Sequence, residues 1–344
     1  MSYSSHINDN VVPPSVNDDH RRAPLIQAGN EHLAERLDTI WQQLISEGIA
    51  NSTRKQYASG QRRFIEFCDL LREQPFPASE VLLLRFVAAN ASRVRGATIQ
   101  NYLSAIRFMH IANGFPNPMG EFERLRLVTR ALKKRSGTGK LRAPVTVPML
   151  NGFYENLDMR QYNDVLFWVM VCAGFFGFLR VSEFTVDGEY LPAYDLNLAD
   201  LSFRPDLSAA ALRVKASKTD PFRRGADVIM GATGDRICPV SAFLAYVGRR
   251  SPAPGVLFRF QNGKPVSRTW FSKRLTKIVT AMQIVGKISS HSLRIGAATA
   301  AANAGVPENI IQILGRWASD AYKSYVRLPR GLITSASRRM LCYG

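Results

Sequence analysis

The sequence is short of cysteine and of acidic residues, and both shortages restrict what the chain can be. Its cysteines are Cys68, Cys172, Cys238 and Cys342, which lie far apart and form no Cys-x-x-Cys pair. This spacing argues against a zinc site or a disulfide framework and fits a reducing compartment. With 27 acidic residues against 45 lysines and arginines, the formal charge is +18. A chain this basic predicts a polyanionic partner, most often nucleic acid, although some basic proteins are merely soluble.

Long apolar runs and targeting signals are also missing. The stretch from Val165 to Leu179 is apolar over 15 residues but is interrupted by Gly174 and Gly177. It falls short of the roughly 18 residues of a membrane-spanning helix, so we predict a buried core helix there. The N-terminus has no basic segment followed by an apolar one, as a secretory signal would. We expect an intracellular protein without a membrane partner.

The order of the sequence patterns predicts a tail, two domains and a linker. Residues 1–30 are polar, and we expect them to be disordered. Apolar residues at helical spacing predict an all-helical domain over 31–132. Residues 133–143 are basic and contain glycine, which is typical of an interdomain linker. Residues 144–344 mix helical patterns with two strand-like stretches.

The chain as a whole is therefore predicted to be mainly α-helical with a small β-sheet. The strands are expected near 210–216 and 226–230. The first helix is expected from Glu31, with an apolar face made by Leu33, Leu37, Ile40, Trp41, Leu44 and Ile45, and the second from Ser52. The later helices are expected near 79–92, 97–112, 120–134, 147–157, 161–179, 239–249, 268–283, 290–304, 307–315 and 331–341.

Five residues of the second half have side chains suited to an anion site. Arg180 directly follows the apolar run, and a charge against a core needs a partner or an anionic ligand. Glu183, three residues later, shares a helical face with it and is expected to hold its guanidinium. His291 and Arg294 open a predicted helix, whose N-terminus favours an anion. The indole N–H of Trp317 can donate to a phosphate oxygen. Each residue taken alone is better explained by a plain ion pair, a surface position or core packing than by a site.

Taken together, these motifs resemble the tyrosine recombinase (phage integrase) family. The resemblance is carried by His-Ser-Leu-Arg-Ile-Gly-Ala-Ala-Thr-Ala at 291–300, Gly-Arg-Trp at 315–317 and Tyr-Val-Arg at 325–327. The second half resembles that of Cre and, more closely, the recombinases of Crypton-type and DIRS-type mobile elements. In the first half, residues 98–103 and 114–118 are similar to the region of a DNA-contacting helix of Cre.

The resemblance implies a two-domain, Cre-like clamp that cuts and rejoins DNA through a 3′-phosphotyrosine, with no metal, ATP or other cofactor. The implied catalytic residues are Arg180, Glu183, Lys218, His291, Arg294, Trp317 and Tyr325. The two arginines and the indole would bind the phosphate, with the glutamate supporting one arginine. The lysine would be the general acid for the leaving oxygen, the histidine would move a proton or orient the phosphate, and the tyrosine would be the nucleophile.

Two of these assignments have a neighbour of the same type. Lys215 and Lys218 both flank the predicted hairpin, and Lys218 is preferred because Ser-Lys-Thr lies at its turn. Tyr322 is the alternative nucleophile, and Tyr325 is preferred because it begins Tyr-Val-Arg. Two other functions also remain open: a catalytically silent DNA-binding protein derived from a recombinase, and a type IB topoisomerase.

The same resemblance implies a double-stranded DNA partner with inverted-repeat half-sites, bound by a dimer and synapsed by a tetramer. We expect residues 331–341 to pack in trans on a neighbouring protomer, with packing on the same protomer as the alternative. An element from a eukaryote would act in the nucleus. The residues expected to contact DNA are Arg54, Lys55, Arg62, Arg63, Thr98, Gln100, Asn101, Arg107, Lys133, Lys134, Arg135, Lys140 and Arg142.

The charge of +18 generates a first testable prediction. Binding to a fluorescent DNA duplex should weaken steeply with salt, by about 0.9 log units per log unit of salt for each phosphate contacted, because bound cations are released. Fluorescence anisotropy titrations between about 50 and 200 mM NaCl measure this slope. An affinity that hardly changes over this range would contradict a duplex-binding surface.

Overall fold

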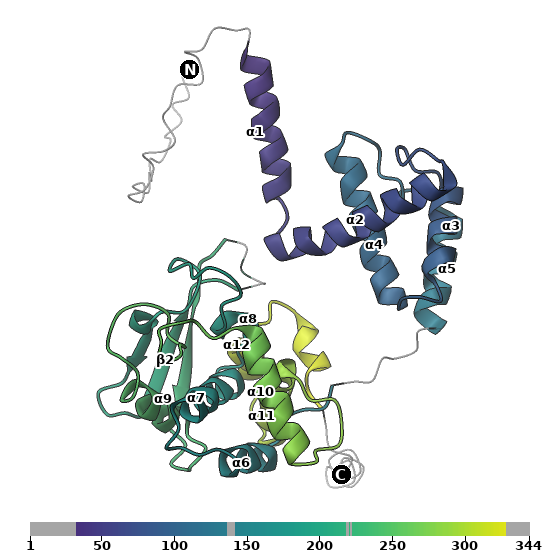
Figure 1. The fold of residues 1–344 in the computed structure, drawn as a ribbon. Coiled ribbons are helices and arrows are strands. Elements are labelled where there is room, and N and C mark those ends of the chain that lie inside the picture. Colours follow the sequence, from purple (N-terminus) through teal and green to yellow (C-terminus); the bar gives the residue numbers. More distant parts are fainter. Residues whose placement is uncertain (1–31, 136–141, 218–219, 221, 328–344) are drawn as a thin grey trace, which may run out of the picture. The chain divides into compact units, whose positions relative to one another are not determined.

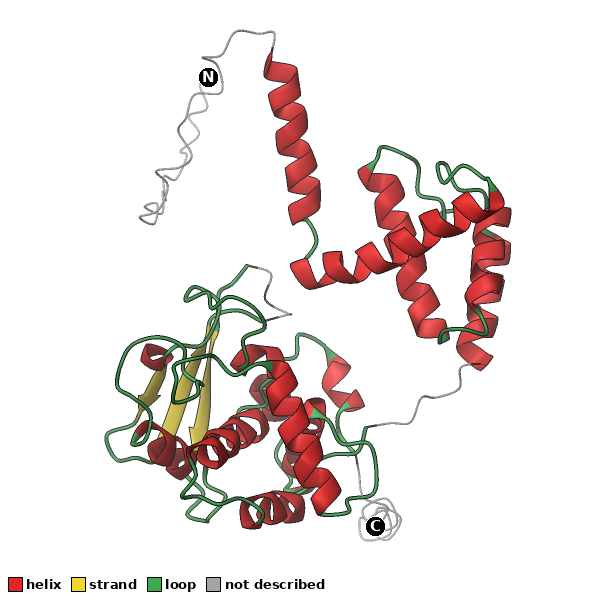
Figure 2. Ribbon diagram, viewed as in Figure 1, coloured by secondary structure: helices red, strands yellow, loops and turns green. Residues whose placement is uncertain are grey.

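The computed structural model describes residues 32–135, 142–217, 220 and 222–327. The chain divides into two compact units, residues 1–139 and 140–344, and each has a hydrophobic core of its own (Figure 1). Helices predominate, and the strands described form a single three-stranded sheet in the second unit (Figure 2). The mainly helical class with a small sheet is confirmed.

Unit 1 is all-helical. Its elements are α1 (Leu33–Glu47), α2 (Asn51–Leu71), α3 (Glu80–Asn90), α4 (Gly96–Ala112) and α5 (Glu123–Arg135). Helix α2 packs on α4, and both α3 and α4 contact α5. Phe64 and Phe86 meet edge to face in the core, 5.4 Å apart between ring centres. Ser79 begins α3 by accepting a hydrogen bond from the backbone of Leu82 at 3.1 Å, as an N-cap residue does.

Helix α1 has the predicted apolar face but buries none of it. Its large apolar side chains that stay exposed are Leu37, Ile40, Trp41 and Leu44. The periodicity therefore predicted the helix correctly, while the core of unit 1 begins only at α2.

Unit 2 is built around helix α7 (Tyr162–Phe176), which is buried along nearly its whole length. Around it lie α6 (Val147–Glu155), α8 (Val181–Phe184), η2 (Leu198–Asp200), α9 (Pro239–Val247), α10 (Arg268–Ala281), α11 (Ser290–Asn303), α12 (Glu308–Gly315) and η3 (Asp320–Ser324). Helix α7 is the core helix that the apolar run predicts. In the described part of the chain, no helix combines the length and the apolarity needed to cross a bilayer.

The sheet has the order β1-β2-β3 with antiparallel pairing throughout. Its strands are β1 (Leu201–Phe203), β2 (Ala209–Val214) and β3 (Ala226–Gly231). Leu212 pairs with Val228, and both side chains face the core. Strand β1 was not predicted, because three residues are too few to show an alternating pattern.

Helix α7 ends three residues before its predicted end. Gly177 caps it, and Phe178 adopts a left-handed backbone with φ 50°. The chain therefore turns sharply just before Arg180, and the last carbonyl groups of α7 point out of the helix without helical partners.

A second close approach positions the start of α11. The backbone of Val145 donates to the carbonyl of Ser292 at 2.9 Å. A Cβ on Gly296 would lie 1.9 Å from the Val145 carbonyl oxygen. Only glycine allows this contact, which holds the first residues of unit 2 against the helix that carries His291 and Arg294.

Candidate active site

The ion pair expected between Arg180 and Glu183 is present at the beginning of α8. The Oε1 atom of Glu183 accepts from Nη1 of Arg180 at 2.9 Å, and its Oε2 accepts from the Arg180 backbone N–H at 2.9 Å. The side chain of Glu183 is 2 % exposed and that of Arg180 is 17 % exposed. The pair is therefore held by one short helix, with the guanidinium still partly open to a ligand.

Arg294 is fully buried on α11. Its Nη1 donates to the carbonyl of Phe178 at 2.6 Å, and its Nη2 donates to the carbonyl of Gly315. Phe178 lies in the turn after α7, and Gly315 is the last residue of α12, where the helix dipole favours a cation. Burial, followed by repulsion from Arg180, lowers the pKa of Arg294 to about 10. The guanidinium is still charged at neutral pH, so unit 2 carries a buried positive charge at this position.

Trp317 places its indole beside this guanidinium. The Arg294 Cζ atom lies 4.5 Å from the centre of the ring. A Cβ on Gly315 would lie 1.7 Å from an atom of the indole, so only glycine lets the ring pack there. The Nε1 atom of Trp317 is buried and has no hydrogen-bond partner among the described residues, and the same is true of Nε of Arg294. Both are donors at a site that offers them no protein acceptor.

His291 begins the cluster from the first turn of α11. Its ring centre is 5.1 Å from that of Tyr325. Burial is the largest cause of its lowered pKa of about 4, and repulsion from Arg142, Arg294 and Arg180 adds to it. The imidazole is therefore neutral at pH 7 and is able to accept one proton.

The two candidate tyrosines have different surroundings. The ring of Tyr325 lies 4.9 Å from that of Trp317, and the Arg294 guanidinium lies 5.8 Å from its centre. The Thr299 hydroxyl donates to the carbonyl of Tyr325 at 3.3 Å and fixes this segment on α11. Tyr322, in contrast, is buried, and its hydroxyl donates a hydrogen bond to the Glu308 carboxylate, which raises the pKa of the phenol. Only Tyr325 stands among the arginines and the histidine.

A site of this composition suits one kind of ligand. Buried guanidinium groups together with unpaired N–H donors match a tetrahedral oxyanion such as a phosphate ester. The phenol and the neutral imidazole beside them are a nucleophile and a proton acceptor.

Comparison with known proteins points the same way. Residues 233–327, which include His291, Arg294, Trp317 and Tyr325, match the phage integrase family. The chain therefore carries a phage integrase domain. Over 281 residues the chain is 24% identical to an integrase/recombinase xerD homolog of Selenomonas ruminantium, covering 78% of this chain and 79% of that protein.

The fold is shared with solved tyrosine recombinases. The XerH site-specific recombinase in a post-cleavage complex with palindromic difH superposes with a TM-score of 0.61 at 17% identity, over 82% of this chain and 78% of XerH. The Tn1549 transposon integrase in complex with transposon right end DNA superposes with a TM-score of 0.56 at 15% identity, over 88% of this chain and 99% of that one.

The phage integrase domain, with the segment before it in unit 2, gathers most of the predicted catalytic residues. Those brought together are Arg180, Glu183, His291, Arg294, Trp317 and Tyr325. Lys218 lies outside the described residues. The alternative, Lys215, is bound by Asp200 at 2.7 Å and donates to the Pro192 carbonyl at 2.8 Å. An ammonium group anchored in this way supports the preference for Lys218.

One residue of the cluster escaped the sequence-based prediction. Arg316 stands inside Gly-Arg-Trp, and its Nη2 atom binds Oε2 of Glu183 at 2.7 Å. Its Nη1 atom donates to the carbonyl of Gly177 at 3.2 Å. Sequence spacing gives no hint of this contact, because Glu183 and Arg316 are 133 residues apart.

The residues expected to contact DNA in unit 1 lie mainly on exposed surfaces of α2 and α4. Exposed among them are Arg54, Lys55, Arg62, Gln100, Asn101 and Arg107. Arg63 is half-buried and donates to the side chain of Asn90 at 2.6 Å. This contact links α2 to the end of α3 and is a structural role for Arg63. Thr98 is half-buried near the beginning of α4.

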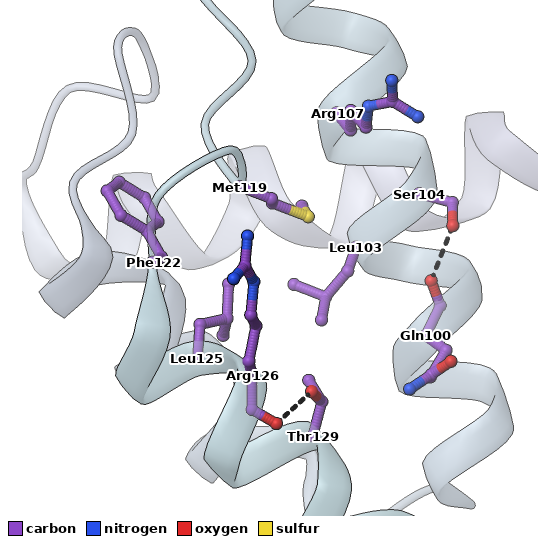
Figure 3. A pocket seen from close by; sticks show the side chains of 9 residues that line it. All are labelled: Gln100, Leu103, Ser104, Arg107, Met119, Phe122, Leu125, Arg126 and Thr129. Atoms are coloured by element: carbon purple, nitrogen blue, oxygen red, sulfur yellow. Dashed lines mark hydrogen bonds between the residues drawn. The ribbon is translucent and has the colours of Figure 1, made fainter.

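Gln100 and Arg107 also line a pocket of about 200 Å³ between α4 and α5 (Figure 3). Arg126, from α5, lies across the pocket and donates hydrogen bonds to Glu123 at 2.6 Å and to the Gly120 carbonyl at 2.7 Å.

The remaining residues expected to contact DNA lie near the linker. Those that are exposed are Lys133, Lys134, Arg135 and Arg142, while Lys140 lies outside the described residues. Basic and amide side chains thus remain available along α4 and α5.

The lowered pKa of His291 can be tested in the DNA-free protein. We expect its imidazole to titrate near pH 4, because burial and three arginines oppose its protonation. Nuclear magnetic resonance of the imidazole measures the midpoint, with His291→Gln identifying the signal.

The same shift predicts the sign of a stability change. Between pH 6.5 and about 4 the unfolded chain binds a proton at this position and the folded chain does not. The free energy of unfolding should therefore fall as the pH falls through this window, less so for His291→Gln. A His291 midpoint at 6.5 or above would contradict the buried, arginine-lined environment.

Proposed function

We propose that the chain is a site-specific DNA recombinase that cuts and rejoins DNA through a covalent 3′-phosphotyrosine at Tyr325. The position of Tyr325 supports this most directly, because its ring lies within 5.1 Å of the ring of His291 and 5.8 Å from the Arg294 guanidinium. A phenol beside a neutral base and a buried cation is placed to attack a bound phosphodiester.

In the proposed cleavage step, Arg180 and Arg294 bind the non-bridging oxygens of the scissile phosphate. The Tyr325 oxygen forms a bond to phosphorus, and the bond from phosphorus to the 5′-oxygen breaks. The phenol proton passes to His291, whose lowered pKa leaves it free to accept it. Lys218 gives a proton to the leaving 5′-oxygen. Attack by a 5′-hydroxyl on the phosphotyrosine reverses the step.

In this mechanism, arginines stabilise the negative charge that develops on the phosphate oxygens. We therefore propose that the reaction needs neither metal nor nucleotide. Three guanidinium groups lie around the site, and the indole N–H of Trp317 adds a donor. The bond energy of the phosphodiester is kept in the phosphotyrosine. Within the described residues, no group of three or more His, Cys, Asp or Glu side chains is gathered as a metal site would require.

We further propose a duplex with inverted-repeat half-sites as the partner, bound by a dimer in which the two units of each chain clamp the DNA. The complex of XerH with a palindromic site supports the symmetry. The likeness to a transposon integrase supports a role in moving a mobile element.

Replacement of the nucleophile tests the proposed chemistry. Tyr325→Phe should bind the duplex with unchanged affinity yet form no covalent adduct, because only the phenol oxygen is lost. The assay traps protein on a nicked suicide duplex that carries the site selected from a random DNA pool. Tyr322→Phe is the matched control and should still form the adduct. Trapping by Tyr325→Phe together with loss in Tyr322→Phe would reverse the assignment, and adducts with neither wild type nor variants would favour a silent DNA-binding protein.

Removal of divalent metal tests the role given to the arginines. The rate of adduct formation should be the same in excess EDTA as in Mg²⁺, because no metal stabilises the transition state. Arg294→Lys serves as the reference, since loss of the planar fork should slow the step by about 10²–10³-fold. Activity that is abolished by EDTA and restored by Mg²⁺, with DNA binding unchanged, would contradict the proposal.

Assembly is proposed to use the C-terminal segment in trans. Residues 331–344, which lie outside the described residues, carry the apolar pattern that predicts a helix packed on a neighbouring protomer. Deleting them should leave binding to one half-site unchanged while weakening cooperative binding to the full site, because a head-to-tail contact joins protomers. Gel-shift titrations on half and full sites measure both. Undiminished cooperativity would mean that the segment packs on its own protomer.

A further inference from the structure

We propose that Arg316 is a positioning residue of this site: by occupying one oxygen of Glu183, it holds the Arg180 guanidinium open towards a phosphate. The inference rests on the proposed function for the identity of the ligand. The described contacts of the Arg316 side chain are with Gly177 and Glu183, and none is with Tyr325 or His291. The inference gives a role to the middle residue of Gly-Arg-Trp.

The backbone brings the Arg316 side chain inwards at a strained position. Arg316 ends α12 in the left-handed conformation, with φ 53°, and its N–H donates to the Ile313 carbonyl at 2.9 Å. Helices commonly end on such a residue, but glycine is the usual one there. A residue other than glycine costs some backbone energy at this position. The guanidinium is only 13 % exposed, so its contacts are made inside unit 2.

The contacts divide the Glu183 carboxylate between two arginines. Oε1 binds Nη1 of Arg180 at 2.9 Å, and Oε2 binds Nη2 of Arg316 at 2.7 Å. A carboxylate and a guanidinium left to themselves prefer two parallel hydrogen bonds. With Oε2 engaged by Arg316, the side chain of Arg180 makes a single bond to Glu183 and keeps its other N–H groups for a ligand.

Charge adds a second effect. Arg180, Arg294 and Arg316 surround one carboxylate, which leaves the cluster with a net charge of +2. Burial and the nearby Arg180 both lower the pKa of Arg316, while Glu183 opposes that change. An interior excess of positive charge is relieved only by an anion. Arg316 therefore raises the affinity of the site for phosphate without touching it.

Two variants and a control separate this role from a purely structural one. Arg316→Met removes the charge and both contacts, and Arg316→Lys keeps the charge and the contact to Glu183 but not the second contact to Gly177. Arg213→Met is the control, because Arg213 forms a half-exposed pair with Asp227 at 3.2 Å on the sheet of the same unit. Thermal melting of each variant shows whether it folds, and if Arg316→Met does not, Arg316→Gln, which also loses the charge but keeps a polar side chain, carries the test in its place.

The first measurement needs no catalysis. Inorganic phosphate is titrated into each protein, and the dissociation constant is read from the His291 imidazole signal. Arg316→Met should bind phosphate about tenfold more weakly, the worth of one charge-assisted hydrogen bond, with Arg316→Lys in between and Arg213→Met unchanged. Unchanged affinity in both Arg316 variants would overturn the inference, whether or not the protein proves to be a recombinase.

The second measurement is the single-turnover rate of adduct formation at saturating DNA. Arg316→Met should be slower by about 10²-fold, as expected for misplacement of a catalytic group. The deficit should shrink on a duplex with a neutral methylphosphonate at the scissile position, which depends less on Arg180. An equal deficit on both substrates would mean general damage and overturn the inference. Absence of adduct in the wild type would refute the proposed function alone, and the phosphate titration would still decide the role of Arg316.

Discussion

The site depends on one constraint, the gathering of one buried and two half-buried arginines around a single carboxylate. Glu183 binds Arg180 and Arg316, while Arg294 relies on the carbonyl groups of Phe178 and Gly315. Water solvates these charges less than on an open surface, so the surrounding chain has to fix their position. The sharp turn after α7 and the left-handed end of α12 both serve this purpose, because they release carbonyl groups towards the arginines. The hydrophobic core around α7 offsets the cost.

The remaining features of the site follow from this stored charge. His291 is neutral because the arginines and its burial oppose protonation, and a neutral imidazole is what a proton acceptor needs. The unpaired N–H of Trp317 points to the same ligand as the arginines. A bound phosphate would satisfy these groups together. It would also make protonation of His291 easier at the moment when a proton has to leave the phenol, since an anion raises the pKa of a neighbouring base.

Sequence patterns predicted those parts of the fold and site that depend on short-range spacing. Helical periodicity found every long helix of the described chain, and three-residue spacing found the pair of Arg180 and Glu183. Strand β1 was missed because three residues carry no period. Arg316 was missed because its partner lies 133 residues away, across a fold that spacing does not reveal. The exposed apolar face of α1 shows a further limit, since periodicity predicts an amphipathic helix but not what covers it.

The two tyrosines show why local sequence and fold are both needed to place a nucleophile. Tyr322 and Tyr325 are of the same residue type and only three residues apart. The 3-10 turn between them directs Tyr322 to Glu308, where a hydrogen bond raises the pKa of its hydroxyl and holds its proton. It leaves the Tyr325 ring beside the Arg294 guanidinium and the His291 ring. The fold thus gives the two phenols different partners, and only Tyr325 lies beside the arginine and the histidine that suit a nucleophile.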